Sequence, residues 1–455
     1  MKTFDIEVEN FGPIKRGKIE TTRLNIICGP NNSGKSIFLH SFYSFLAWEA
    51  YRLLDFPVPP EILKSVQTTG TVTIPLSEYS ASVNECLDKG NDVFIKRIPD
   101  LLLKQSVIFK DATIHVTTNP SYLEKVKENR SWEWQITENC GVIFSQSGDS
   151  LVATFVNTGD KYPDADVISL VIKIAIKSVL VGFIFNNLAY LVTSERTGAA
   201  MFANHIPLSA KEESQPPESK NSSIRKPFPV AHFRELDFIS HANLTPLSQK
   251  NSRFAQDKKY DHIFNLLHRI TSGTYIFDEA RGMCFIPDVN KTLQLDMSEV
   301  SSSIRSLMSL HVLLRHRINS YGAIVMIDEP EINLTPHNQR LLARLLVQLA
   351  KAKIDVFITT HSDYIVREIN TLVALNQKTE RTKKIANDYG YGENECIKPD
   401  DVALYYIKKP EEMKPEDDNA FERIVLNGDF SVEIPPFDDS IREMGNLQSE
   451  LSWED

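Results

Sequence analysis

A glycine-rich loop near the start of the chain and a pair of acidic residues far downstream constrain the fold more than any other feature. The loop consists of Gly29, Pro30, Asn31, Asn32, Ser33, Gly34, Lys35 and Ser36, and it fits the G-x-x-x-x-G-K-S pattern of a phosphate-binding P-loop. The downstream segment is an apolar run, residues 323–327, that ends in Asp328 and Glu329. Continuous apolar runs are typical of buried parallel strands, and unpaired carboxylates are costly to bury. Together the two segments predict an α/β fold with a site for ATP and Mg²⁺, at which ATP is hydrolysed.

Each residue of this predicted site has an expected role. The loop amides surround the β-phosphate at the N-terminus of the following helix, where the helix dipole favours anions. Lys35 reaches the β- and γ-phosphate oxygens, and Ser36 ligates Mg²⁺. Asp328 holds Mg²⁺ through water, and Glu329 orients or deprotonates the attacking water. The alternatives are a chance match to the loop pattern and a surface turn after a core strand.

A histidine follows the next strand-like run. Residues 354–358 are apolar except for Asp355, and they lead into Thr359, Thr360, His361 and Ser362. At a strand-to-helix junction beside the acidic pair, His361 can contact the γ-phosphate and sense its loss. We therefore treat His361 as a candidate catalytic residue, and an incidental histidine after a strand is the alternative.

Composition excludes several classes of protein. A net charge of −10 provides no overall attraction for nucleic acid. The five cysteines are scattered without metal-ligand spacing, which indicates a reduced, cytoplasmic compartment. The N-terminus lacks the apolar core of a signal peptide. Residues 167–192 are apolar but contain Lys173 and Lys177, so a buried helix is expected there and no membrane partner.

The hydrophobic pattern predicts several segments within 455 residues. After residue 300, strand-like and helix-like runs alternate, which favours a largely parallel sheet. Residues 209–229 are polar and rich in Pro and Ser, as in a surface loop. The expected segments are an N-terminal part of the ATPase core with the P-loop (1–65), a β-rich subdomain (66–160), a helical insertion with a hairpin (161–300), a C-terminal part of the core (301–400) and a tail with a short strand (401–455).

The motifs resemble those of ABC-type ATPases of the SMC, RecF and OLD group. The resemblance rests on the P-loop, on Asp-Glu-Pro-Glu-Ile-Asn-Leu-Thr-Pro at 328–336, on Thr-Thr-His-Ser at 359–362, and on the long stretch between the first two. It covers residues 1 to 375. It implies an ABC-type head, in which a P-loop core carries an antiparallel β subdomain, here with a helical insertion. In that group Asn333 would belong to the D-loop, which crosses a dimer interface.

The resemblance also implies that a signature loop of a second copy closes on the γ-phosphate. This loop would be Ser301, Ser302 and Ser303, before a helix rich in Leu and Met. The family pattern has glycine here, which lets the backbone approach phosphate. The serines therefore predict turnover below about ten per second, the median for enzymes. Composite sites of this kind require at least a dimer, and the sequence sets no upper limit on a ring.

A further segment, residues 190–198, resembles the P-A-E-R-S-G element of OLD-like ATPases. It contains Glu195 and Arg196. The alternative interpretation of these two residues is the end of a strand that carries a surface ion pair.

The biological role has three candidate interpretations. OLD proteins carry a Toprim nuclease with a D-x-D cluster, and no D-x-D follows His361. Stand-alone ATPases of this kind resemble subunits of bacterial phage-defence systems, in which an oligomeric ATPase holds a separate effector nuclease until a phage-derived trigger appears. The second candidate is a RecF-like repair ATPase that clamps duplex DNA through eight basic residues between Lys220 and Lys259. The third, a transport ATPase, is disfavoured by the long insertion and the missing signature glycines.

Overall fold

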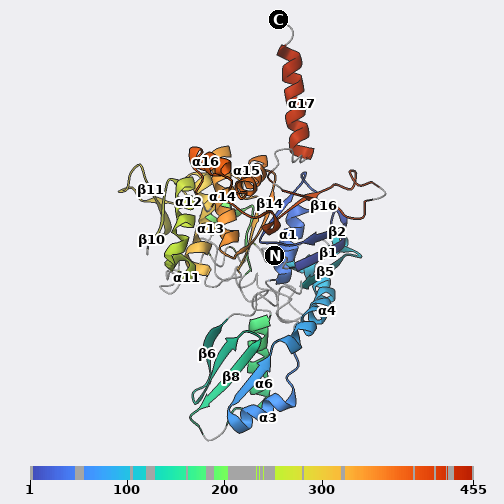
Figure 1. Cartoon of the computed structure of the whole chain (residues 1–455), viewed down its shortest axis with the longest axis vertical. Coiled ribbons are helices and arrows are strands. Elements are labelled where there is room, and N and C mark those ends of the chain that lie inside the picture. Colours follow the sequence, from blue (N-terminus) through green and yellow to red (C-terminus); the bar gives the residue numbers. More distant parts are fainter. Residues whose placement is uncertain are drawn as a thin grey trace.

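A central six-stranded sheet organises the computed structural model of the chain (Figure 1). The structure describes residues 4–46, 56–102, 106–118, 129–159, 162–180, 189–202, 232, 235, 239, 252–278, 281–318, 323–392, 395–414, 417–426, 428 and 435–452. The strand order is β16-β15-β3-β14-β13-β9, and all neighbours are parallel except β15 and β16. The strands are β3 (Leu24–Cys28), β9 (Ala189–Val192), β13 (Ile324–Asp328), β14 (Asp355–Thr360), β15 (Val402–Ile407) and β16 (Phe421–Ile424).

Helices cover both faces of this core sheet, which explains why its strands are continuous apolar runs. Every residue of β3, β13, β14 and β15 is buried. In β13, Ile324 and Met326 pack in the cluster that contains α1, whereas Val325 and Ile327 pack on the opposite side. The covering helices are α1 (Lys35–Ser44) on the first face and α12 (Asp261–Thr271), α14 (Pro336–Lys351) and α15 (Asp363–Leu375) on the second.

In the described part of the chain, three antiparallel sheets accompany the core, and the third in chain order is β10-β11-β12, with residues 273–278, 282–287 and 295–296. The sheet β2-β1-β5 contains β1 (Phe4–Phe11), β2 (Ile14–Glu20) and β5 (Thr113–Thr118). The second, here called the peripheral sheet, has the order β4-β8-β7-β6 and forms the lower lobe in Figure 1 together with α3 and α6. Its elements are α3 (Pro60–Thr69), β4 (Thr71–Pro75), β6 (Arg130–Thr137), β7 (Cys140–Ser147), β8 (Ser150–Asn157) and α6 (Ala165–Leu180).

The remaining elements pack in different places. Helix α4 (Ser77–Leu102) and the turn Ser106–Phe109 join the cluster of the first face, most of the others pack around the second face, and helix α17 projects from the upper end of the molecule (Figure 1). These elements are α4 (Ser77–Leu102), α8 (Arg196–Phe202), α11 (Arg253–Gln256), β10 (Gly273–Asp278), β11 (Gly282–Pro287), β12 (Leu295–Asp296), α13 (Ser302–Val312) with a π-helical turn (Leu313–Arg317), α16 (Glu380–Asp388), α17 (Pro435–Ser452) and single 3₁₀ turns at Ser106–Phe109, Lys258–Tyr260 and Pro399–Asp401.

The α/β fold class predicted from the sequence, with a P-loop core, an antiparallel β subdomain and additional helices, is confirmed. Two details differ from the predicted segments. Strand β15 lies beside β3 inside the core sheet, although residues after 400 were expected to form a tail. The range 66–160 also contains the 26-residue helix α4, and its strand β5 pairs with β1 of the first segment. In both cases long-range pairing joins residues that a boundary drawn along the chain separates.

Other predictions have a mixed outcome. Helix α6 is a packed helix, with Ile168, Ile172 and Ile176 buried. Among the helices that the structure describes, none combines the length and the apolar character needed to cross a bilayer. The thiols of Cys28, Cys140, Cys284 and Cys396 form no disulfide in the described part of the chain, and all four are buried. The cytoplasmic location stays a prediction. The polar segment 209–229 lies outside the described residues.

Candidate functional site

The loop between β3 and α1 has a backbone conformation that only glycine tolerates at two positions. Gly34 has φ 99°, and a Cβ there would lie 2.9 Å from Pro13 Cγ. Gly29 has φ 152°, and a Cβ there would lie 2.8 Å from the carbonyl oxygen of Ile407. Both values lie where side chains are strained. The loop therefore turns tightly at the carboxyl end of β3 and leads directly into the N-terminus of α1.

Lys35 is the first residue of α1, and its side chain folds back over the loop. Its Nζ donates hydrogen bonds to the carbonyl oxygens of Gly29 at 3.0 Å and Pro30 at 2.8 Å. Burial lowers the pKa of the ammonium, and the nearby carboxylates of Glu329 and Asp328 oppose this shift. The amine is thus held between the loop and the acidic pair, where phosphate oxygens would replace the carbonyls as acceptors.

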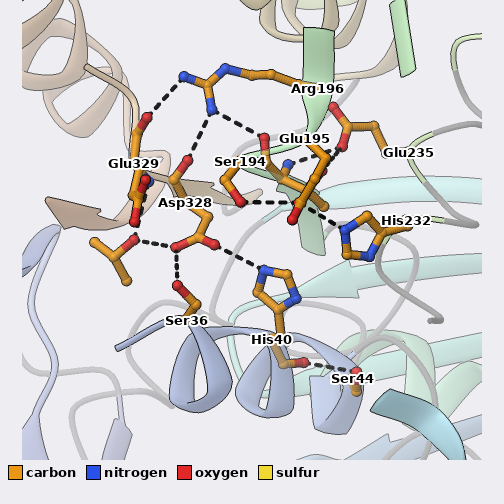
Figure 2. Close-up of polar contacts among 12 residues, drawn as sticks. Ser36, His40, Ser44, Ser194, Glu195, Arg196, His232, Glu235, Asp328 and Glu329 are labelled. Atoms are coloured by element: carbon orange, nitrogen blue, oxygen red, sulfur yellow. Dashed lines mark hydrogen bonds and ion pairs between the residues drawn. The ribbon is translucent and has the colours of Figure 1, made fainter. Parts of the chain in front are cut away.

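Asp328 lies buried at the end of β13 and meets α1 directly (Figure 2). The Ser36 hydroxyl donates to Asp328 Oδ1 at 3.0 Å, and His40 Nε2 lies 3.2 Å from Oδ2. The Thr359 hydroxyl also donates to Oδ1. Burial alone would raise the pKa of Asp328, but the hydrogen bonds with His40, Thr359 and Ser36 lower it overall. The carboxylate is therefore ionised at neutral pH.

The donor set around Asp328 fits Mg²⁺. Hydroxyl and carboxylate oxygens are the protein ligands that this ion prefers, and Ser36 supplies the first while Asp328 supplies the second. A second observation points to a bound anion beside them. The Ser33 hydroxyl in the loop is buried and has no hydrogen-bond partner among the described residues, as expected for a donor to a phosphate oxygen.

Glu329 follows Asp328 with a backbone φ of 48°, in the left-handed region. Its amide donates to the carbonyl and the hydroxyl of Thr359, both at 3.1 Å. Burial, and next the charge of Asp328, raise the pKa of the Glu329 carboxyl. His361 Nε2 lies 3.7 Å from Glu329 Oε1, and burial followed by the charge of Lys35 lowers the pKa of this histidine. A carboxyl with a raised pKa beside a neutral imidazole suits proton transfer.

These residues line one cavity of about 630 Å³, within the usual range for small-molecule sites. The structure thus brings together Lys35, Asp328, Glu329 and His361 from three parallel strands of the core sheet. The far wall is formed by residues that sequence reasoning did not assign to the site. The residues that line the cavity are Pro13, Asn31, Asn32, Ser33, Gly34, Lys35, Ser36, Ile37, His40, Leu102, Ser194, Glu195, His232, Asp328, Glu329 and His361.

The segment after β9 contributes two charged side chains with opposite surroundings. Glu195 is largely exposed and pairs with His232 at 2.8 Å, and this hydrogen bond is the main reason why its pKa falls to about 2. Arg196 is buried, and among the described residues its guanidinium donates hydrogen bonds only to backbone carbonyl oxygens. The interpretation as a surface ion pair therefore holds for Glu195 and is wrong for Arg196. The resemblance of residues 190–198 to the P-A-E-R-S-G element was the sequence signal for both, and the pairing of β9 with β13 brings them to this site.

His40 was also missed, although it lies one helical turn after Ser36. Residues four apart lie on the same face of a helix, so the side chain that follows Ser36 by four positions meets the same carboxylate. Glu331 provides a further link, because its carboxylate accepts a hydrogen bond from the amide of His361 at 2.5 Å. These contacts tie the loops after β13 and β14 to each other and to α1.

The serines expected to act as a signature loop, and Asn333, lie apart from this cavity. Ser301 caps helix α13, where its hydroxyl accepts from the amide of Ile304, and Ser302 is exposed beside it. Ser303 Oγ lies 2.8 Å from Ser301 Oγ. Asn333 is exposed in the turn after β13, with φ 65°. Within one chain, none of these four residues lines the cavity around Lys35.

Comparisons with known proteins bear on the family and on the fold. A family model described as an AAA ATPase domain matches residues 1–179 and 199–366. Among solved structures, the chain is similar to an SMC head bound to the C-terminal winged-helix domain of ScpA, with 12% identity, 93% of this chain and 98% of that chain covered, and a TM-score of 0.35. It is also similar to the SMC head domain from Thermotoga maritima, with 12% identity, coverage of 81% and 92%, and a TM-score of 0.29. No curated protein matches the chain significantly.

Proposed function

Because the chain belongs to the AAA ATPase domain family, we propose that it binds ATP with Mg²⁺ and hydrolyses it slowly in the cavity between the P-loop and Glu329. One observation carries this proposal: Lys35, Asp328 and Glu329, from distant parts of the chain, line the same cavity. The loop that contains Lys35 lies at a helix N-terminus, where anions are favoured. The buried, unpartnered Ser33 hydroxyl adds a donor for phosphate at the same place.

The contacts support a role for each residue. The loop amides and Lys35 bind the β- and γ-phosphates, while Ser36 and Asp328 would hold the metal. Bound Mg²⁺ supplies positive charge against the phosphate oxygens. Glu329 orients the attacking water and accepts its proton, for which its raised pKa is suited. His361, 3.7 Å from Glu329, contacts the γ-phosphate.

The exposed serines support a composite site formed by two copies of the chain. Ser301 and Ser302 lie at the N-terminus of α13, a position that favours anions, yet they do not reach the cavity of their own chain. Asn333 is similarly exposed. In this proposal the serines of one copy complete the γ-phosphate site of a second copy, so the active form is a dimer or a larger ring. Serines in place of glycines hold the backbone further from phosphate, which accounts for slow turnover.

The biological role that we propose is a sensor and scaffold in anti-phage defence. ATP binding closes the oligomer, which holds a separate effector, a Toprim-type nuclease, until a phage protein triggers its release. The support is the resemblance of its motifs to those of stand-alone ATPases of such systems. The ATPase subunit of the PARIS system is the nearest named candidate, on size and architecture.

A two-step experiment tests the proposal. Purified chain with a slowly hydrolysed ATP analogue is expected to sediment as a dimer or larger species, whereas the Lys35→Ala variant with the same analogue is not. Affinity purification from the native host is then expected to recover a nuclease, and nucleotide dependence of its recovery tests the scaffold role. A chain that stays monomeric with nucleotide contradicts the composite site, and a chain that co-purifies with no nuclease contradicts the defence role.

The alternative function predicted from the sequence is clamping of duplex DNA, and it leads to a different expected result in solution. Of its eight basic residues, only Arg253, Lys258 and Lys259 lie in the described part of the chain, and Lys258 and Lys259 are exposed there. This alternative predicts salt-sensitive binding to duplex DNA in the presence of an ATP analogue. A lack of binding at low salt removes it.

A further inference from the structure

Arg196 joins three segments that the proposed function assigns to different tasks. Its Nη1 donates to the carbonyl oxygen of Asp328 at 2.9 Å, and its Nη2 donates to that of Glu329 at 2.8 Å. Its Nε donates to the carbonyl oxygen of Ser306 in α13 at 3.0 Å, and Nη1 also bonds Thr193 at 3.1 Å. Figure 2 shows the guanidinium above the two acidic residues, with dashed lines to the backbone of each. One side chain thus bridges the end of β13, the end of β9 and the helix that carries the exposed serines.

Burial of a charged side chain such as Arg196 costs free energy, which argues that the residue has a specific role. The side chain is 1% exposed, and burial lowers the pKa of its guanidinium while Glu235 is the main group that raises it. Glu235 is itself buried and accepts hydrogen bonds from the amide and the hydroxyl of Thr193, at 2.9 and 2.6 Å. A planar guanidinium presents five N–H donors in a fixed fork. A lysine ammonium carries a similar charge but cannot reach the same separated carbonyls with that geometry.

The contacts of Arg196 bear directly on the backbone of Glu329. That residue has φ 48°, a strained backbone conformation that persists only when neighbouring groups hold it. Thr359 binds the amide of Glu329 and Arg196 binds its carbonyl oxygen. Hydrogen bonds from two other segments therefore hold both the N–H and the carbonyl group of Glu329.

We propose that Arg196 is a positioning residue that holds Glu329 in its active conformation and ties it to helix α13. The proposal rests on the proposed ATP hydrolysis. Ser306 lies four residues after Ser302, so a rigid turn of α13 separates the carbonyl that Arg196 binds from the exposed serines. When a second copy draws those serines onto its nucleotide, the shift of α13 reaches Glu329 through Arg196. The state of one site in the oligomer thereby affects hydrolysis at the next.

A matched pair of conservative variants tests this role. Arg196→Lys keeps the positive charge and replaces the planar guanidinium, with its fixed set of N–H donors, by an ammonium group. Arg344→Lys does the same to a second buried arginine, 5% exposed, which bonds Glu368 at 2.7 Å and does not line the cavity. We expect Arg196→Lys to slow single-turnover hydrolysis about 100-fold, the effect of a misplacement near 1 Å, with an unchanged Kd for a fluorescent, non-hydrolysable ATP analogue. Arg344→Lys should lower the melting temperature and leave both quantities as in the wild type.

A second measurement needs neither nucleotide nor activity. Amide hydrogen exchange without nucleotide should be faster in Arg196→Lys than in Arg344→Lys for two segments, residues 323–331 and 301–307. If the wild type hydrolyses no ATP, the proposed function fails, and the exchange data still decide whether Arg196 holds these segments. Exchange that rises equally in both variants overturns the positioning role. Hydrolysis by Arg196→Lys at the wild-type rate overturns the link to Glu329.

Discussion

The core sheet and the peripheral sheet use similar apolar residues in opposite ways. Strands β13 and β14 of the core are buried along their whole length. Strand β7 of the peripheral sheet alternates between buried and exposed residues, with Ile143 41% exposed on its outer face, and Val156 of β8 is 49% exposed. The core sheet is packed on both faces, whereas the peripheral sheet leaves one face open to solvent.

This difference explains where the chemistry lies. In a sheet covered on both faces, polar side chains find room mainly at the ends of strands, so Asp328, Thr359 and the P-loop gather at one carboxyl edge. In the peripheral sheet, polar residues such as Glu133 spread along the open face. The comparison predicts that the same substitution at equally buried positions of the two sheets changes the free energy of unfolding equally. Its effect on ATP hydrolysis should differ between the two sheets.

The largest expected effect comes from Glu329→Gln. Loss of the proton acceptor should slow ATP hydrolysis about 1,000-fold, within the range for general acid–base catalysis. ATP binding should persist because Asp328 and Ser36 are unchanged, and the closed oligomer should accumulate. Phosphate release under single-turnover conditions and sedimentation measure the two outcomes. The exposed Glu133→Gln in the peripheral sheet is the matched control, and normal hydrolysis by Glu329→Gln would show that the assigned role is wrong.

Lys35→Ala should weaken ATP binding about 100-fold, since charged hydrogen bonds to phosphate contribute up to about 3 kcal/mol. Isothermal titration calorimetry measures the Kd. Lys64→Ala removes the same side chain from an exposed position on α3 in the peripheral lobe and should leave the Kd unchanged. Equal affinities in the two variants would contradict the placement of phosphate beside Lys35.

Two identical changes at fully buried positions sharpen the comparison further. Ile358→Val in β14 and Ile74→Val in β4 both affect side chains that are 0% exposed. Each should lower the free energy of unfolding by about 1 kcal/mol, as measured by chemical denaturation. Only Ile358→Val should also slow hydrolysis, because Ile358 directly precedes Thr359, which binds Asp328 and Glu329. An equal loss of activity in both variants would mean that the peripheral lobe takes part in catalysis.

The smallest effect is expected on the open face of the peripheral sheet. Val156→Thr should change the free energy of unfolding by less than about 0.5 kcal/mol, as is usual for exposed positions, and should leave hydrolysis unchanged. Chemical denaturation of this variant beside Ile74→Val compares the two faces of one sheet. A loss as large as that of Ile74→Val would indicate that another part of the protein covers this face.

Much of the core could be predicted from local patterns. Three segments can be recognised from about ten residues each, because hydrophobic period and turn chemistry are local properties. They are the P-loop, the apolar run that ends in Asp328 and Glu329, and the strand before His361. Strand β15 could not be placed in this way, since its pairing with β3 joins residues nearly the whole chain apart. His40 escaped notice, and the resemblance that singled out Arg196 did not give its role, for a related reason: the role of a single arginine or histidine depends on its partners, and local sequence does not show them.

The amino-acid sequence by itself determined which residues make up the proposed nucleotide site, because a glycine-rich turn, a lysine and strand-terminal carboxylates carry their chemistry in their own side chains and spacing. Only the tertiary structure decided how those residues are held. The buried fork of Arg196, the contact of His40 with Asp328 and the left-handed backbone of Glu329 depend on hydrogen bonds between segments that meet only when the parallel sheet has formed. Such contacts are set by packing in three dimensions, and no local pattern of residues encodes them.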